Sequence, residues 1–130
     1  IGEGNIEAAL VSAESASLLS PNDPVVFFQL GLLNYHSENF ESAVVALERA
    51  VGLNNQYSNA RYFLGLSYYE AGRRDDGIAQ FEEIEKFNQD NSEVKFILNN
   101  LRSGRAPFTD ATPPIAEPPE DREELPIEGE

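Results

Sequence analysis

The sequence predicts an all-α solenoid, in which antiparallel pairs of helices stack side by side and an extended tail follows them. Residues 22–90 repeat with a period of 34 residues, so that Gly31 aligns with Gly65. A repeat of this length cannot bury its own apolar face and needs neighbouring repeats to cover it. Within each copy, apolar residues recur at helical spacing. From Arg105 onwards the composition changes, because six of the eight prolines follow with acidic residues between them, which predicts an extended segment.

The two copies agree over both halves of the repeat. Residues 28–35 align with residues 62–69, and the later pairs are Phe40 with Arg74, Ala43 with Gly77, Leu47 with Phe81, Ala50 with Ile84 and Leu53 with Phe87. A solenoid offers an extended surface rather than an enclosed reaction centre. The repeat therefore favours a binding or assembly module.

The first expected helix covers residues 7–19. Its small residues form one stripe, made of Ala9, Ala13 and Ala16. Asn5 is the expected N-cap. The helix should end at residues 20–23, because Pro21 disfavours helix for the residue before it.

The second and third helices are expected at residues 24–37 and 40–53. Pro24 is tolerated in a first turn, where its missing N–H would be unpaired anyway. The second helix has apolar residues nearly all round, which indicates packing on more than one side. The third is better striped, through Ala43, Leu47 and Ala50.

The second copy repeats this plan. Ser58 is expected to cap a helix that runs to about Ala71, Gly72 to cap its end, and the next helix to cover residues 75–87. Ser92 should open a last helix that ends at Ser103–Gly104, with an apolar face made of Val94, Ile97, Leu98 and Leu101.

Composition excludes several classes of function. The net charge is −14, from 23 acidic and 9 basic residues, so nucleic acid and anionic membrane surfaces are poor partners. The chain has no cysteine, which excludes disulfides and thiolate chemistry. No apolar stretch approaches the roughly 18 residues that a membrane helix needs, so we expect no membrane insertion by this segment. Because methionine is absent even at residue 1, we expect a processed product or a piece of a longer protein.

No pattern of residues predicts catalysis, a metal or a cofactor. His36 is the single histidine, and no cysteine or paired carboxylate accompanies it, so we interpret it as a polar contact at the rim of a surface. The acidic residues Glu82, Glu83 and Glu85 crowd one helix, where a solvated face explains them better than metal binding. We therefore expect no enzyme activity.

The repeat resembles the tetratricopeptide repeat. The residues that carry the resemblance are Leu30-Gly31, Tyr35, Ala43, Leu47 and Ala50 in the first copy and Leu64-Gly65, Tyr68, Gly77, Phe81 and Ile84 in the second. The resemblance implies a right-handed superhelix with the following divisions: the second helix of a truncated repeat at 1–21, repeats at 22–57 and 58–91, a terminal capping helix at 92–104 and an extended acidic Pro-rich tail at 105–130. Gly77 and Ile84 replace alanines of the family pattern, which predicts looser packing in the second repeat.

The resemblance also implies a concave groove lined by the first helix of each pair. We expect that groove to bind a protein or peptide through Val25, Phe28, Leu32, Tyr35, His36, Asn59, Tyr62, Leu66, Tyr69, Phe96 and Asn100. For the apolar members of this set, packing in the core is the alternative. Phe28 and Leu32 stand where some relatives carry a lysine and an asparagine that grip a terminal carboxylate, so we expect a neutral or apolar ligand.

The tail carries four large apolar residues that we interpret as anchors, Phe108, Ile115, Leu125 and Ile127. They are expected to dock on this chain's own groove or on that of a neighbour. A solvated acidic linker is the alternative.

Two other functions remain open. The first helix lacks its antiparallel partner, so its alanine stripe should face solvent unless another chain covers it. Contact between such open ends, locked by exchanged tails, would give a homo-oligomer or a helical filament. Residues 99–108 and the Pro/Glu tail are also similar to the C-terminal repeats of bacterial membrane proteins of the O-antigen ligase kind, which would place this segment outside the cytoplasm or at the cell surface.

Overall fold

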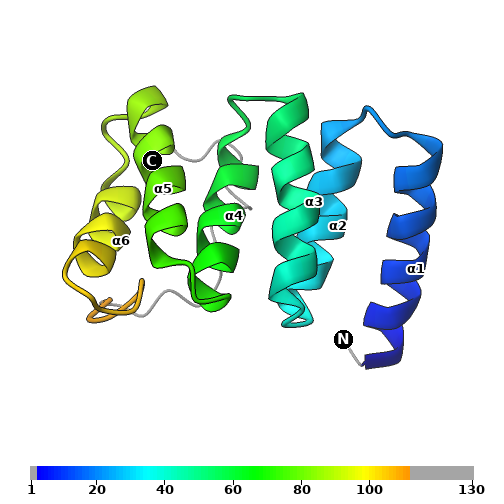
Figure 1. The fold of residues 1–130 in the computed structure, drawn as a ribbon, viewed down its shortest axis with the longest axis horizontal. Helices are drawn as coiled ribbons and strands as arrows, with labels where there is room; N and C mark the ends of the chain where they lie inside the picture. The colour runs from blue at the N-terminus through cyan, green and yellow to red at the C-terminus, as the bar shows by residue number, and fades with distance from the viewer. Residues whose placement is uncertain (1–2, 112–130) are drawn as a thin grey trace.

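The computed structural model describes residues 3–111, which form six α-helices and no β-strand (Figure 1). The helices are α1 (Glu3–Leu19), α2 (Pro24–His36), α3 (Phe40–Leu53), α4 (Ser58–Glu70), α5 (Arg74–Phe87) and α6 (Ser92–Arg102). Each helix packs against the next along the chain, and α2 also contacts α4. The predicted all-α solenoid of antiparallel helix pairs is confirmed.

The helix starts differ from the prediction at two places. α1 begins at Glu3, so Asn5 lies inside the helix and does not cap it. Ser58 is the first residue of α4 rather than its cap, whereas α6 begins at Ser92 as predicted. The cap of α6 is Asn91, whose side chain accepts a hydrogen bond from the Val94 N–H at 3.1 Å. Asp23 caps α2 in the same way.

The helices of each pair approach closely because glycines stand at their crossings. A Cβ on Gly31 would lie 2.5 Å from Leu47 Cγ, and one on Gly65 would lie 2.5 Å from Phe81 Cε2. A Cβ on Gly77 would lie 2.8 Å from the carbonyl oxygen of Gly65. The expectation that Gly77 loosens the second repeat is therefore wrong, because the missing Cβ lets the backbones of α4 and α5 touch.

Burial is greatest at α4, in the middle of the stack of helices, and least at α1. Nine consecutive residues of α4, from Ala60 to Tyr68, are buried. None of residues 5–19 in α1 is buried, and Val11, Leu18 and Leu19 are 63%, 82% and 84% exposed. None of the helices within residues 3–111 is both long enough and apolar enough to cross a membrane.

The alanine stripe of α1 does not face open solvent as expected. Ala9, Ala13 and Ala16 are partly buried and line a cavity that they share with α2. The most exposed large apolar side chains of α1 are Val11, Leu18 and Leu19. α1 packs against α2, but none of its residues 5–19 is buried.

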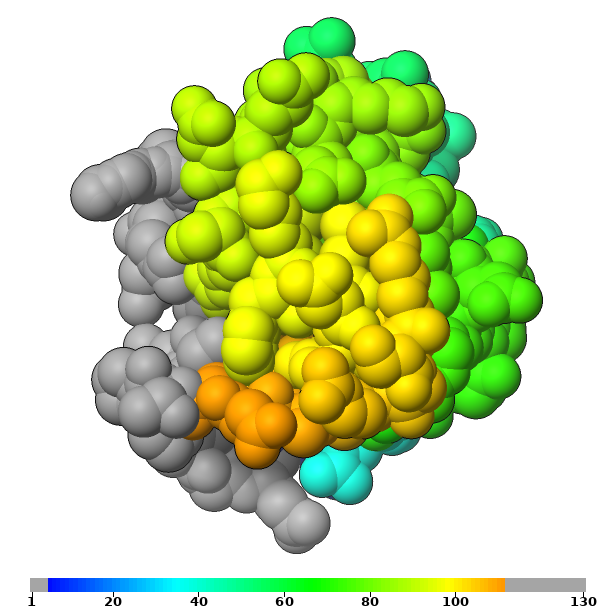
Figure 2. Space-filling view, turned by 90° about the vertical axis from the view of Figure 1, so that its left-hand side faces the viewer, coloured from blue at the N-terminus to red at the C-terminus, as the bar shows by residue number. Residues whose placement is uncertain are grey.

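The segment after α6 folds back on the helix (Figure 2, orange beside the yellow α6). The Asn100 side-chain amide donates to the carbonyl oxygens of Pro107 at 2.9 Å and Thr109 at 3.0 Å. Pro107 is buried and Phe108 packs against the core. Residues 107–110 therefore form a turn rather than an extended chain, while the remaining tail lies outside the described residues.

Candidate peptide-binding groove

The helices α2, α4 and α6 form a row, which we call the inner row. α2 contacts α4 directly, and the Tyr62 hydroxyl on α4 donates to Glu93 Oε2 on α6 at 3.2 Å. These are the first helices of successive pairs. The inner row therefore consists of the helices that were predicted to line the groove.

Aromatic rings gather around Phe63 in this row. The ring of Phe63 lies 5.4 Å from Tyr35, 6.1 Å from Phe28, 6.3 Å from His36 and 5.2 Å from Tyr62, measured between centroids. Tilted and edge-to-face pairs of this kind each contribute about 0.5–1.5 kcal/mol beyond the burial of their area. The cluster fixes the α2–α4 contact and orients the rings at the surface.

The predicted groove residues differ in exposure. Val25 and His36 are exposed, Phe28, Leu32, Tyr35, Asn59, Tyr69 and Phe96 are partly buried, and Tyr62, Leu66 and Asn100 are buried. The groove residues predicted from the sequence did not include Phe63. Its side chain is completely buried and contacts the rings of four predicted residues. The sequence could not single out Phe63, because its apolar type and helical spacing are the same as those of any other core residue.

The structure divides the predicted set by neighbourhood. Phe28, Tyr35 and Tyr62 share the aromatic cluster, whereas Leu32 faces the cavity between α1 and α2 and His36 borders both. Asn100 uses its amide to hold the segment after α6. The groove assignment of the whole set stays a prediction.

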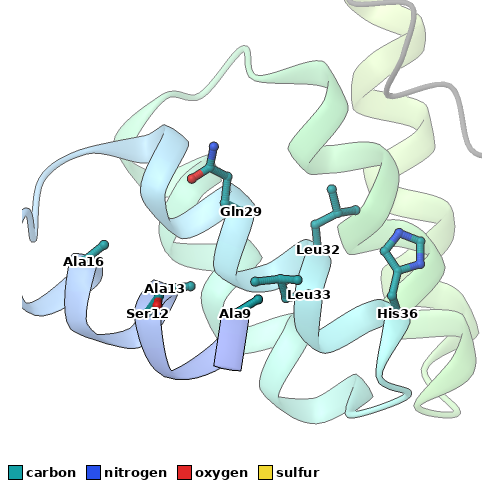
Figure 3. A pocket seen from close by; sticks show the side chains of 8 residues that line it. All are labelled: Ala9, Ser12, Ala13, Ala16, Gln29, Leu32, Leu33 and His36. Atoms are coloured by element: carbon teal, nitrogen blue, oxygen red, sulfur yellow. The ribbon is translucent and has the colours of Figure 1, made fainter. Parts of the chain in front are cut away.

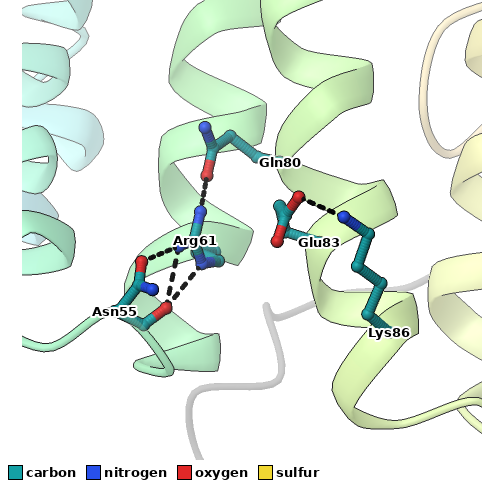
Figure 4. A network of polar contacts seen from close by, with 5 residues as sticks. All are labelled: Asn55, Arg61, Gln80, Glu83 and Lys86. Atoms are coloured by element: carbon teal, nitrogen blue, oxygen red, sulfur yellow. Dashed lines mark hydrogen bonds and ion pairs between the residues drawn. The ribbon is translucent and has the colours of Figure 1, made fainter.

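Charge is nearly absent from the first part of the inner row. α2 carries no Asp, Glu, Lys or Arg. The cation on α4, Arg61, is 6% exposed and fully engaged elsewhere (Figure 4). Its guanidinium donates to the Asn55 carbonyl and side-chain oxygens and to Gln80 Oε1, at 2.6–3.0 Å. Arg61 therefore fastens the α3–α4 loop to α5 and is not available to a ligand carboxylate.

Sequence reasoning did not single out Arg61. Its signal was present, since one arginine within an otherwise apolar and aromatic helix needs buried acceptors. Arg49 and Arg74 act alike. Arg49 on α3 donates to the carbonyl oxygen of Pro21 in the α1–α2 loop, and Arg74 on α5 donates to the carbonyl oxygen of Leu101 in the last turn of α6.

The three glutamates of α5 lie in ion pairs. Glu83 pairs with Lys86 at 2.8 Å, Glu85 with Lys95 at 3.3 Å and Glu82 with Arg102 at 3.0 Å. The hydrogen bond from Lys86 lowers the pKa of Glu83 from its ordinary value. Within residues 3–111 no three His, Asp or Glu side chains are grouped as metal ligands would be.

Of the four predicted tail anchors, the structure describes Phe108. Its ring is partly buried and packs against the core of the same chain. Ile115, Leu125 and Ile127 lie outside the described residues.

The family follows from a sequence match. Residues 34–101 match the model of the tetratricopeptide repeat. The chain belongs to the tetratricopeptide repeat family. The repeat of this family generally serves as an interaction module or scaffold. The similarity of the chain's end to the O-antigen ligase kind stays a prediction.

Relatives and solved structures agree with this assignment. PEX5-related proteins of Mus musculus and Homo sapiens are 26% identical over 100 residues, which cover 77% of this chain. The match spans only 17% and 16% of their own lengths. The crystal structure of MamA superimposes with a TM-score of 0.73 at 25% identity, over 76% of this chain and 58% of MamA. The first TPR of Spaghetti (RPAP3), bound to the HSP90 peptide SRMEEVD, also gives 0.73, at 18% identity and with 78% and 81% covered.

Proposed function

We propose that this tetratricopeptide chain is a scaffold that binds a protein segment along its inner row through apolar and aromatic contacts. The observation that carries the proposal is the ring cluster of α2 and α4, whose outer members Phe28 and Tyr35 are only partly buried. Partly exposed rings on a rigid support offer contact area at low cost in conformational entropy. The segment is extended or helical, as the shape of such a row favours.

The chemistry of the row favours a neutral ligand. RPAP3 binds a peptide with three acidic residues, as its sequence SRMEEVD shows. In this chain α2 offers no lysine or arginine and Arg61 is already engaged. With a net charge of −14, the chain also repels acidic peptides at long range. Neutral apolar segments therefore fit better than an acidic terminus.

A filament built from open ends receives less support. The outer face of α6 is polar, since Lys95, Asn99 and Arg102 are exposed. A polar outer face is typical of a capping helix, which ends a solenoid. Within residues 3–111, these exposed polar side chains of α6 do not favour a contact with a second copy at that end.

Binding is tested by fluorescence anisotropy with two labelled peptides of equal length, one neutral and apolar and one ending in acidic residues. We expect the neutral peptide to bind at least about tenfold more tightly, a difference of about 1.4 kcal/mol. Val25→Arg should weaken binding, because Val25 is 48% exposed at the start of α2. The matched control is Val45→Arg on α3, where the same residue type is 68% exposed away from the inner row. Equal loss in both variants, or preference for the acidic peptide, would contradict the proposal.

A further inference from the structure

A second cavity is lined by residues of α1, α2 and α3, and we call it the α1–α2–α3 cavity. Its volume of about 440 Å³ lies within the roughly 300–1,000 Å³ that is typical of ligand pockets. The cavity shares no residue with the predicted groove or with the cavity that the alanine stripe lines (Figure 3). It is therefore a separate site, for which neither the inner row nor the alanine stripe accounts.

The internal repeat contains an occupied version of this cavity. A shift of 34 residues places α1, α2 and α3 on α3, α4 and α5, so that Asn34 corresponds to Tyr68 and Glu14 to Glu48. Both Asn34 and Glu14 line the cavity. Tyr68 is 7% exposed, and its hydroxyl donates a hydrogen bond to Glu48 Oε2. By this equivalence, the second copy holds a complete tyrosine side chain where the first copy has a cavity.

The cavity results from this exchange of one residue. Asn34 is smaller than tyrosine, and its amide donates back to the Leu30 carbonyl oxygen at 3.1 Å instead of reaching α1. Within residues 3–111, the Glu14 carboxylate makes no hydrogen bond or ion pair that would replace the one between Tyr68 and Glu48. The acceptor of the second copy is thus retained in the first, and its donor is not.

A helix that precedes α1 in a longer chain would not fill this cavity. The counterpart of such a helix in the second copy is α2, because the shift places α1 on α3. The positions that correspond to the lining residues all lie on α3, α4 and α5. The tyrosine that fills the second copy likewise comes from α4 itself. The missing ring must therefore be supplied from outside the stack of helices.

The residues around the cavity suit an aromatic ring that carries one hydrogen-bond donor. Phe27 offers an apolar wall, and the Arg49 guanidinium, 5.7 Å from the centre of that ring, can also face a bound ring. The Glu14 carboxylate accepts hydrogen bonds and cannot donate them. Phenylalanine lacks the donor, and a lysine would meet the positive charge of Arg49. Because Glu14, Val45 and Arg49 are exposed, a side chain on the surface of another protein can enter.

We propose that the α1–α2–α3 cavity binds a tyrosine side chain of a partner protein, whose hydroxyl donates a hydrogen bond to the Glu14 carboxylate. The contact would reproduce the hydrogen bond between Tyr68 and Glu48. The cavity uses no residue of the ring cluster in the inner row. The two surfaces can therefore be occupied independently.

Two peptides that differ by one hydroxyl group test the proposal on the full chain. They are acetylated and amidated Gly-Gly-Tyr-Gly-Gly and Gly-Gly-Phe-Gly-Gly, titrated into the isotope-labelled chain and followed by NMR. We expect the tyrosine peptide to bind at least about fivefold more tightly, because its hydroxyl gains a hydrogen bond to a charged acceptor. The amide signals of residues 42–49 on α3 should shift, and those of α6 should not.

Three variants separate the hydrogen bond from the shape of the cavity. Glu14→Ala should remove the preference for tyrosine, so that both peptides bind with the same affinity. Glu7→Ala is the matched control, because Glu7 is exposed on the same helix and does not line the cavity. Asn34→Tyr should fill the cavity as Tyr68 fills its counterpart, and should weaken the tyrosine peptide at least about tenfold. Circular dichroism checks that each variant keeps its helices.

Several results would overturn the proposal. These are equal affinity of the two peptides for the unchanged chain, a preference for tyrosine that survives Glu14→Ala, and binding that Asn34→Tyr leaves intact. No shift of the signals of residues 42–49 at several millimolar peptide would also overturn it. The inner row is distinguished by charge insertion. Val45→Arg should weaken the tyrosine peptide and Val25→Arg should not, which is the reverse of the effects expected for a neutral apolar peptide without tyrosine at the inner row.

Discussion

Replacing Gly65 by alanine tests whether close approach of the helices holds this repeat together. The added Cβ would lie 2.5, 2.9 and 3.0 Å from three ring carbons of Phe81, which is completely buried. Distances of this size force a shift of α4 against α5, and overpacking of a dense core costs about 1–3 kcal/mol. Alanine also favours helix over glycine by about 1 kcal/mol. The closeness of the contact places the steric cost at the upper end, so we expect a net loss of about 1–2 kcal/mol.

Gly52→Ala is the matched control, because it separates the two contributions. Gly52 lies in α3, is exposed, and has no atom within 4 Å of an added Cβ. This variant should gain about 0.5–1 kcal/mol from helix propensity alone. The difference between the two variants then measures the steric cost at the α4–α5 crossing.

Urea unfolding followed by circular dichroism measures both free energies. We also expect Gly65→Ala to lower Tm by about 5–10 °C, since 1 kcal/mol corresponds to roughly 4–8 °C in a domain of this size. Adding Phe81→Leu to Gly65→Ala should cost less than the sum of the two single changes, because the smaller side chain makes room for the methyl group. If Gly65→Ala proved as stable as Gly52→Ala, the close crossing would not be what stabilises the repeat.

Four further substitutions test single residues. Gly72 and Glu38 follow the ends of equivalent helices and both have a positive φ, 85° and 64°, which favours glycine. Gly72→Ala should therefore lower the free energy of unfolding by about 1 kcal/mol, and Glu38→Gly should raise it by a few tenths of a kcal/mol. Thermal unfolding measures both changes. Burial and the hydrogen bond to Glu48 raise the pKa of Tyr68 above its ordinary value. The stability from Tyr68 is therefore complete below about pH 10 and declines progressively as the pH rises above that value. Tyr68→Phe should flatten the decline of the urea midpoint above about pH 10. Arg61→Lys should lower stability by about 1–3 kcal/mol, because one ammonium cannot reach both Asn55 and Gln80, and a wild-type urea midpoint would refute this role.

The order and number of helix pairs could be predicted because the period of 34 residues repeats every helical stripe. The register was predictable for the same reason, since Gly31 and Gly65 mark equivalent crossings. Helix starts were less predictable. Asn5 and Ser58 are good capping residues by type, yet α1 begins before Asn5 and α4 begins at Ser58 itself.

Contacts between residues far apart in the sequence could not be predicted for another reason. The role of Arg61 depends on acceptors at Asn55 and Gln80, six and 19 residues away, and no periodicity links such positions. The tie from Asn100 to Thr109 likewise depends on how the chain turns after α6. The alanine stripe of α1 was predicted, but its partial burial was not, because the sequence pattern does not show how much of the stripe α2 covers.

The uneven burial along the row makes the two halves of this molecule open at different rates. Amide hydrogens of α4, whose residues from Ala60 to Tyr68 are all buried, should exchange with deuterium only on global unfolding. Those of α1, where none of residues 5–19 is buried, should exchange by fraying long before. Among residues 3–111, unfolding would therefore begin at α1 and proceed toward α4.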